Sequence, residues 1–483
     1  MAAAGKISAK DAEDFGSNPL VVMAGARSSW VPWGPSDATP ILHHPDPKMK
    51  LLRTTLLSLF ATGLLAAQDI SPVLFGQNHW LAQGDEGRTG YLHLLWPQVK
   101  QSGVQLVRIG GNAYNVTPPS LARWTAMVDS VQAIGAEPLL QVPHTFTAAQ
   151  ATELVKHFNA PGRKPVRYWS IGNEPMLHDK LSLEEAHAYL ARIAPALRAA
   201  DPTIKILIFD EAWLRRPAFD ELCGGKLDLT GKDSAGRWLI DGFTFHSYPN
   251  GEKFGRNDVI ATGPQKIRQD AKTLVGLLEQ ANQKHGRTGD ARLMWGLTEV
   301  NVTYANPDRD IEGNGNPSFL GGQFLAEIFG IGMEYGALTV APWCISETDD
   351  PKTDFGFLGL PPDFSPRSSY YHTQLMARYL KGRCLKTSSK DPLVKIIGAR
   401  TDKQIALLVM NQDQTTERVL KLDLTLGDAA LSADAGLKKS LEVKIPSQTS
   451  QVYVLDAKGR VIEKITYGIQ HNLRNLPPQT ERY

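Results

Sequence analysis

Two glutamates stand directly after short apolar runs of the kind that form buried strands. Glu174 lies in Arg167-Tyr-Trp-Ser-Ile-Gly-Asn-Glu-Pro175, and Glu299 lies in Leu297-Thr-Glu-Val-Asn301. Cleaving an acetal needs one group that protonates the leaving oxygen and another that meets the positive charge developing at the anomeric carbon. Two carboxyl groups can share these tasks, so a pair brought together by the fold could do acid/base and nucleophilic chemistry on a glycosidic bond.

Other polar and aromatic residues follow further apolar runs, and each also has a purely structural interpretation. Arg108 could serve the site or only brace it, Asp210-Glu211 could bind a distal sugar or form a loop salt bridge, and Trp343 could belong to the core. The candidates besides the two glutamates are Arg108, Asn112, His144, Asn173, His246, Tyr248 and Trp343. Three glutamates compete with Glu299: Glu327 and Glu334 fall in a helical pattern that predicts a solvated face, and Glu347 could line the site.

Positioning these residues requires a scaffold, and the chain alternates between short apolar runs and longer helical patterns from residue 70 to about 382. The predicted strands are Pro72–Gly76, Gln105–Ile109, Glu137–Val142, Arg167–Ile171, Ile204–Phe209, Asp241–Phe245, Arg292–Leu297 and Leu338–Pro342. Eight strands with helical connections match a (β/α)8 barrel. A doubly wound open sheet gives a similar alternation, but it would gather polar residues at one crevice, whereas here they follow most strands.

The helical patterns between the strands include 119–134, 148–158, 182–200, 264–285, 319–335 and 365–380, and Ser182 is a predicted N-cap. After about Gly382 the long helical patterns stop. Short strand-like runs separated by polar turns predict an antiparallel β-sandwich over 383–483, with residues 472–483 as a docking or frayed tail. The catalytic barrel is therefore expected over 68–382.

The N-terminal part carries a targeting pattern. Residues 49–67 combine a basic start, an apolar stretch and small residues, which is typical of a bacterial signal peptide, so we expect a secreted or periplasmic protein. Residues 1–48 lack strand or helix periodicity and are interpreted as an unstructured leader or a misassigned start. An uncleaved anchor over residues 50–65 is the alternative. No membrane span is expected in the mature protein.

Composition excludes several classes of partner. The 483 residues carry 52 basic and 50 acidic side chains, a net charge of +2, which does not indicate a nucleic-acid binder or a polybasic membrane protein. Three cysteines rule out a disulfide framework, although Cys344 and Cys384 could form one bridge if they are not simply buried thiols. No zinc spacing appears, so no cofactor or metal is expected, and the protein is expected to be a monomer. The acidic loop Asn306–Pro317 is a solvated loop or, alternatively, a Ca2+ site.

The motifs as a whole resemble the clan A glycoside hydrolases. These enzymes share a (β/α)8 barrel, an Asn-Glu pair after strand four and a second glutamate after strand seven. The resemblance implies a retaining double displacement with Glu174 as acid/base and Glu299 as nucleophile. It also implies that Asn173 binds the sugar 2-hydroxyl, that Tyr248 and Arg108 hold the nucleophile, and that Trp343 forms the floor of the −1 subsite. His246-Ser-Tyr248-Pro matches the strand-six motif.

Three short segments are most similar in sequence to the family 44 endoglucanases, with families 39, 51 and 79 as near alternatives. These segments are Ile70–Asn78, Arg108–Asn112 and Tyr168–Pro175. The expected function is cleavage of β-glycosidic bonds in a polysaccharide or oligosaccharide, with an endo-β-glucanase as the first choice. An exo-acting xylosidase, arabinofuranosidase or glucuronidase is the alternative. A noncatalytic carbohydrate-binding barrel and a metal-dependent hydrolase using His144 and His246 are the alternatives from other classes.

Overall fold

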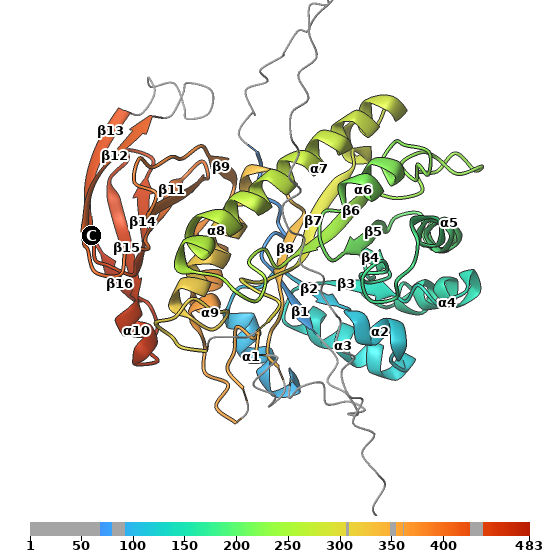
Figure 1. Cartoon of the computed structure of the whole chain (residues 1–483), viewed down its shortest axis with the longest axis horizontal. Helices are drawn as coiled ribbons and strands as arrows, with labels where there is room; N and C mark the ends of the chain where they lie inside the picture. Colours follow the sequence, from blue (N-terminus) through green and yellow to red (C-terminus); the bar gives the residue numbers. More distant parts are fainter. Residues whose placement is uncertain (1–67, 80–91, 306–308, 348–353, 361, 426–437) are drawn as a thin grey trace, which may run out of the picture. The chain divides into compact units, whose positions relative to one another are not determined.

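The chain forms a barrel of eight parallel strands followed by an antiparallel β-sheet domain (Figure 1). The computed structural model describes residues 68–79, 92–305, 309–347, 354–360, 362–425 and 438–483. Neighbouring strands pair in chain order from β1 to β8. The barrel strands are β1 Gly76–His79, β2 Leu106–Ile109, β3 Glu137–Val142, β4 Tyr168–Ile171, β5 Lys205–Glu211, β6 Gly242–Ser247, β7 Met294–Val300 and β8 Thr339–Pro342.

The first and last strands meet, which closes the barrel. Phe75 forms a parallel bridge with Val340, and the Ile345 amide donates to the Asn78 carbonyl at 3.0 Å. The barrel prediction is therefore confirmed, and seven of its strands lie within a few residues of the predicted bounds. The first predicted strand, 72–76, was wrong: Leu74 N donates to Ser71 O in a turn, and the strand runs through the buried polar residues Gln77–His79 instead.

The alternation of side chains along the strands arranges the barrel interior in layers. Leu106, Leu139, Tyr168 and Leu207 form an apolar cluster with Val73. Since side chains two positions apart in a strand face the same side, Arg108, Gln141 and Ser170 also point inward, one step nearer the carboxyl ends of their strands. All three are fully buried. The barrel interior thus has an apolar layer toward the amino ends of the strands and a polar layer toward their carboxyl ends. The candidate site residues begin at this polar layer.

Helices lie outside the strands (Figure 1). Two begin with a reciprocal capping box, Thr147 with Gln150 and Ser182 with Glu185, in which each side chain accepts from the other residue's backbone amide. The predicted N-cap at Ser182 is confirmed. The helices are α1 Leu92–Gln101, α2 Asn112–Val116, α3 Leu121–Ala133, α4 Ala148–Phe158, α5 Leu183–Ala200, α6 Arg216–Leu222, α7 Gly263–His285, α8 Phe319–Glu334 and α9 Ser368–Tyr379.

The C-terminal part folds into two antiparallel sheets. One holds β16, β15, β14, β11, β10 and β9 in that order, and the other pairs β12 with β13. Leu422 and Val443 of the small sheet share an apolar cluster with Ile405 and Tyr453 of the large one. The strands are β9 Arg383–Leu385, β10 Val394–Arg400, β11 Gln404–Asn411, β12 Arg418–Thr425, β13 Lys438–Ile445, β14 Thr449–Asp456, β15 Val461–Gly468 and β16 Gln479–Arg482.

The end of the chain is more ordered than a frayed tail. After α10 Ile469–Leu473, strand β16 pairs with β15 along the edge of the large sheet. The backbone pairing adds a strand that the sequence did not predict, because all four residues of β16 are polar and exposed and so carry no apolar alternation.

Buried polar contacts join α8 and α9 to the large sheet. Gln323 donates to Asn411 O and Ser450 Oγ at 3.3 and 3.2 Å, and His372 Nε2 lies 2.8 Å from the same Ser450 hydroxyl. Glu327 of α8 pairs with Lys395 at 3.3 Å. Glu327 was expected on a solvated face, and this was wrong because the β-domain covers that face of the helix. Glu334 is half-exposed and pairs with Arg268, as a surface residue does.

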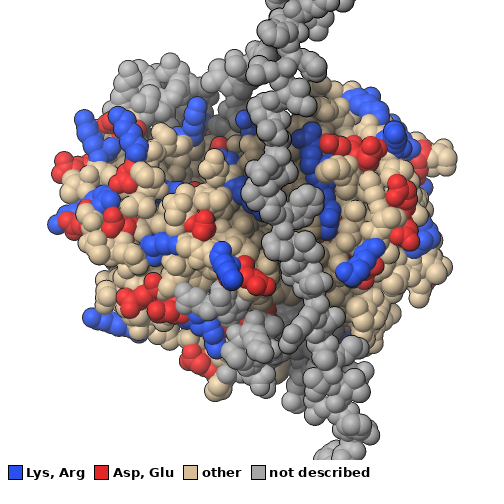
Figure 2. All heavy atoms as spheres, viewed as in Figure 1, with Lys and Arg blue, Asp and Glu red and all other residues tan. Residues whose placement is uncertain are grey.

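Other sequence expectations have simple outcomes. All three cysteines are free thiols, so the bridge between Cys344 and Cys384 does not form. Among the described residues, no helix combines the length and the apolar character that crossing a membrane requires. The segments 1–48 and 49–67 lie outside the described residues. Figure 2 shows basic and acidic side chains interspersed over the visible face, in line with the near-balanced charge of the chain.

Candidate active site

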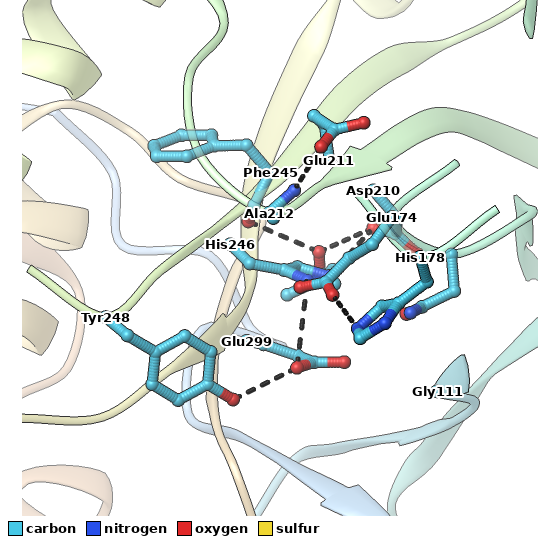
Figure 3. A network of polar contacts seen from close by, with 12 residues as sticks. Gly111, Glu174, His178, Asp210, Glu211, Ala212, Phe245, His246, Tyr248 and Glu299 are labelled. Atoms are coloured by element: carbon cyan, nitrogen blue, oxygen red, sulfur yellow. Dashed lines mark hydrogen bonds and ion pairs between the residues drawn. The ribbon is translucent and has the colours of Figure 1, made fainter. Parts of the chain in front are cut away.

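The fold brings Glu174 and Glu299 together at the carboxyl ends of the barrel strands (Figure 3). Glu174 follows β4 and Glu299 lies near the end of β7. One carboxylate oxygen of each, together with a ring nitrogen of His246, falls within a mutual distance of 4.8 Å. Both side chains are 8 % exposed, so they lie in a largely desolvated setting that still has access to solvent. The predicted pair is therefore a real cluster in the structure.

Each oxygen of Glu299 has its own hydrogen-bond donor. Arg108 Nη1 donates to Oε1 at 2.8 Å, and the Tyr248 hydroxyl donates to Oε2 at 3.0 Å. Burial raises the pKa of Tyr248 well above its ordinary value, and the negative charge of Glu299 acts in the same direction, so the phenol stays a donor. The two contacts fix the orientation of the carboxylate.

Arg108 is the centre of a buried network under the two glutamates. Its guanidinium donates to Asp210 Oδ2 through Nε and Nη2 at 3.2 and 3.1 Å, to Asn173 Oδ1 at 2.6 Å and to Asn78 Oδ1 at 3.0 Å. Burial opposes its charge, but Asp210 and Glu299 outweigh that penalty and raise the pKa of Arg108 further. Burial likewise opposes the charge of Asp210, yet Arg108 lowers its pKa. The two carboxylates thus share one guanidinium.

The carboxylate of Glu174 contacts two imidazoles. His246 Nδ1 lies 2.7 Å from Oε1, and His178 Nε2 lies 2.7 Å from Oε2. Burial by itself would raise the pKa of Glu174, but the hydrogen bonds from His178 and His246 outweigh it and lower the pKa below its ordinary value. Nearness to the negative charge of Glu299 would by itself raise this pKa. The two imidazoles outweigh that effect as well.

The backbone around Glu174 is held in an unusual conformation. Glu174 has a φ of 43°, in the left-handed region that costs about 1–2 kcal/mol for a residue with a Cβ. Its amide donates to the Asp210 carbonyl at 2.9 Å. The buried carboxylate of Glu211 accepts from the Met176 amide at 3.1 Å and pairs with Arg215. Asp210 and Glu211 therefore brace the site from β5, which supports the structural interpretation over a distal sugar site.

Trp343 is placed by contacts on three sides. Its indole Nε1 donates to Glu347 at 3.2 Å, and its carbonyl accepts from Asn301 at 2.6 Å. A Cβ added to Gly111, whose φ is 120°, would stand 2.8 Å from Trp343 Cη2. Only a glycine therefore allows the backbone after β2 to approach the ring so closely. Glu347 is buried and anchors this indole, so it does not compete with Glu299.

Two predicted residues are not joined to the glutamate pair. Asn112 begins α2, and no hydrogen bond of its side-chain oxygen is found among the described residues. His144 packs against the Tyr189 ring and lies 3.5 Å from Asp179 Oδ2. Asp179 adjoins His178, so His144 belongs to a neighbouring cluster.

The contacts of the possible ligand atoms disfavour a cation between the glutamates. Among the described residues, Glu174, His246 and Glu299 are the only three with a spacing that could hold an ion, and the group does not include His144. The Glu299 oxygens already accept from Arg108 and Tyr248, and the adjacent guanidinium would repel a cation. In the described part of the 306–317 loop, Arg309 pairs with Asp354.

Sequence reasoning missed His178 and did not predict that Asp210 pairs with Arg108. His178 stands four residues after Glu174, and its amide donates to the Glu174 carbonyl at 2.9 Å in a single helical turn. That spacing was a usable signal, because residues i and i+4 face each other on such a turn. Asp210 had no comparable signal, since its partner Arg108 is 102 positions away in the chain.

Comparison with known proteins supports the architecture. No protein-family model matches the chain, and no curated protein matches it in sequence. Solved structures do match: a family 51 α-L-arabinofuranosidase from Bifidobacterium longum has a TM-score of 0.60 at 15% identity, covering 80% of this chain and 96% of that one. A family 44 xyloglucanase from Paenibacillus polymyxa has a TM-score of 0.55 at 12% identity, covering 80% and 96%.

A third match is a family 30 subfamily 8 xylanase from Clostridium acetobutylicum, with a TM-score of 0.52 at 14% identity, covering 81% of this chain and 98% of that one. Families 44 and 51 were among the four that the motifs resemble, whereas family 30 was not. At these identities the comparison speaks for the fold. The chain shares the (β/α)8 barrel and trailing β-domain of clan A glycoside hydrolases.

Proposed function

We propose that this protein is a retaining glycoside hydrolase, with Glu299 as nucleophile and Glu174 as acid/base. The observation that carries the proposal is the spacing of the two carboxylates, with oxygens within 4.8 Å of each other. This approaches the roughly 5–5.5 Å carboxyl separation of retaining enzymes and falls short of the roughly 6.5–9.5 Å that leaves room for a water.

The contacts of each glutamate suit the two steps of a double displacement. Glu299, oriented by Arg108 and Tyr248, attacks the anomeric carbon. The leaving oxygen takes a proton from Glu174 as the glycosidic bond breaks. The ester that forms at Glu299 has no charge, and Glu174 then takes a proton from the water that releases the sugar. Asn173 uses its side-chain oxygen for Arg108, which leaves its amide nitrogen to donate to the sugar 2-hydroxyl.

Chemical rescue distinguishes the two roles. Glu299→Ala and Glu174→Ala should each lose at least about 1000-fold in kcat on a poor leaving group. Azide should restore turnover of an activated aryl glycoside in both variants, giving a glycosyl azide of inverted anomeric configuration with Glu299→Ala and of retained configuration with Glu174→Ala. Unchanged turnover by Glu299→Ala would refute the proposal. Asp220→Asn, a change in a surface ion pair, is the control.

For the substrate, we propose β-glycosidic bonds in a polysaccharide, cleaved internally as by an endo-β-glucanase. The structural match to a family 44 xyloglucanase supports this choice. The matches to family 51 arabinofuranosidases favour a second candidate, exo-acting release of a terminal sugar. Product lengths from a panel of polysaccharides separate the two: oligosaccharides of several lengths indicate internal cleavage, and a single monosaccharide indicates exo action.

We further propose that the protein is exported. The signal-peptide pattern of residues 49–67 supports this. Expression from Met49 with a C-terminal tag in a bacterial host should give a cell-envelope or medium fraction of shortened protein, whose new N-terminus can be sequenced. Recovery of only the uncleaved chain, still starting at Met49, in the cytoplasm would contradict the proposal.

A further inference from the structure

His178 is unusual among the residues around the glutamate pair because it is the one of the two Glu174 partners that contacts solvent. Its side chain is 44% exposed, whereas that of His246 is fully buried. Figure 3 shows the His178 ring directed at the Glu174 carboxylate, where it meets Oε2 while His246 meets Oε1. The turn between the two residues, closed by the His178 amide on the Glu174 carbonyl, sets the 2.7 Å contact.

The surroundings of His178 are predominantly acidic. Glu174 accepts its hydrogen bond, and Asp179 and Glu299 add negative charge, so the pKa of His178 lies above its ordinary value, chiefly through the bond to Glu174. Beyond Asp179 stands His144, whose Nδ1 lies 3.5 Å from the Asp179 carboxylate. Two ionised glutamates as close as these would repel each other strongly, and an imidazolium beside Glu174 offsets that repulsion.

The 2.7 Å contact therefore joins the proposed acid directly to an imidazole that reaches solvent. We propose that His178 is a positioning residue that stores the proton for Glu174, so that the acid of the free enzyme is a Glu174–His178 pair. The inference rests on the proposed function and adds to it the source of the catalytic proton. His246 cannot take this part, because it is sealed from solvent and lies between Glu174, Glu299 and Asp210.

The proton balance is simple. In the free enzyme His178 is protonated, and Glu174 and Glu299 are ionised. As Glu299 bonds to the anomeric carbon and the glycosidic bond breaks, the leaving oxygen takes a proton from Glu174, which receives that of His178 Nε2. The covalent intermediate then has a neutral His178 and an ionised Glu174. In the second step Glu174 takes a proton from the attacking water and returns it to His178, while Glu299 leaves as a carboxylate.

The dependence of kcat/KM on pH tests this inference. In the wild-type protein the basic limb reports the pair losing its proton, so its midpoint should lie above about 6.5, the ordinary histidine pKa. In His178→Gln the same limb should report a lone carboxyl group and shift down by at least about one pH unit. His157→Gln, which removes an imidazole bound to Thr125 on the outer helices, should leave the limb in place.

Leaving-group dependence provides a second readout. A dinitrophenyl glycoside needs no proton to depart, so His178→Gln should cleave it at close to the wild-type rate, while an alkyl glycoside should be cleaved at least about tenfold more slowly at pH 7. If the basic limb of His178→Gln coincided with that of the wild type, the inference would be overturned. The proposed function would still stand in that case if Glu299→Ala were inactive in the same series. NMR titration of the His178 ring in the unmutated protein tests it without a variant: a midpoint at or below 6.5 overturns it.

Discussion

Arg108 and Asp210 form a fully buried ion pair that crosses the barrel from β2 to β5, with two hydrogen bonds from the guanidinium to Oδ2. Removing one partner of such a pair strands the other charge in a desolvated setting, which costs about 3–5 kcal/mol. Asp210→Asn should therefore lower the stability by about 3 kcal/mol and also disturb Glu299, which depends on the same guanidinium.

Thermal unfolding and kcat/KM on one aryl glycoside should both fall for Asp210→Asn. Asp220→Asn removes a surface carboxylate that pairs with Arg216, and it should change neither quantity measurably. An Asp210→Asn protein with wild-type stability and turnover would show that the buried pair has no part in the site.

Tyr248 supplies the hydrogen bond to Glu299 Oε2. Tyr248→Phe keeps the ring and removes only this donor. Since a hydrogen bond to a charged group contributes about 1.5–3 kcal/mol, kcat should fall about 10- to 150-fold with the melting temperature nearly unchanged. Steady-state kinetics on a chromogenic glycoside measures the effect. Tyr304→Phe, at an exposed tyrosine after β7, is the matched control and should behave as wild type.

Gly111 is expected to control the position of Trp343. Gly111→Ala adds a Cβ that meets the indole at 2.8 Å and also strains a backbone with φ of 120°. Gly162→Ala places the same methyl at φ 88° with no atom within 4 Å, so it reports the backbone strain alone, about 1–2 kcal/mol. Gly111→Ala should therefore raise KM at least about fivefold, whereas Gly162→Ala should not. Equal kinetic behaviour of the two variants would argue against a substrate contact by Trp343.

His372 predicts a pH dependence of stability at the contact with the β-domain. Burial lowers its pKa to about 4 from an ordinary 6.5. The unfolded chain therefore binds a proton on this residue below pH 6.5 while the folded protein does not, so the stability contributed is complete above pH 6.5 and is lost as pH falls toward 4. The loss amounts to about 3 kcal/mol for this one group.

Thermal midpoints measured between pH 4 and 7 check this. Burial lowers the pKa of His79 to about 3, so this residue also makes the protein less stable as the pH falls. Comparing the wild type with His372→Gln isolates the part that is due to His372. The variant should lose less stability on acidification. A variant with the same slope as the wild type would show that His372 binds a proton equally in both states. Replacing the surface residue His157 by Gln gives the control slope.

Local patterns in the sequence determined most of the fold. Apolar runs of strand length, helical periodicity and capping residues act over a few positions, and they placed α4 and β3 at their observed bounds. The same local patterns placed Glu174 and Glu299 at strand ends, and the resemblance supplied Arg108 and Tyr248 as the partners of Glu299. Strand β1 was misplaced and β16 was missed because their residues are polar or irregular in pattern.

The tertiary structure alone decided how the site is charged. Burial and distance set the state of each carboxylate, and both depend on residues far apart in the chain. His246 is 72 positions from Glu174, and Asp210 is 102 from Arg108. Glu174 consequently lies between two imidazoles that lower its pKa, opposite to what its nearness to Glu299 suggested. The sequence by itself thus determined which strand ends carry the two glutamates, and the three-dimensional packing determined which charged groups surround each of them.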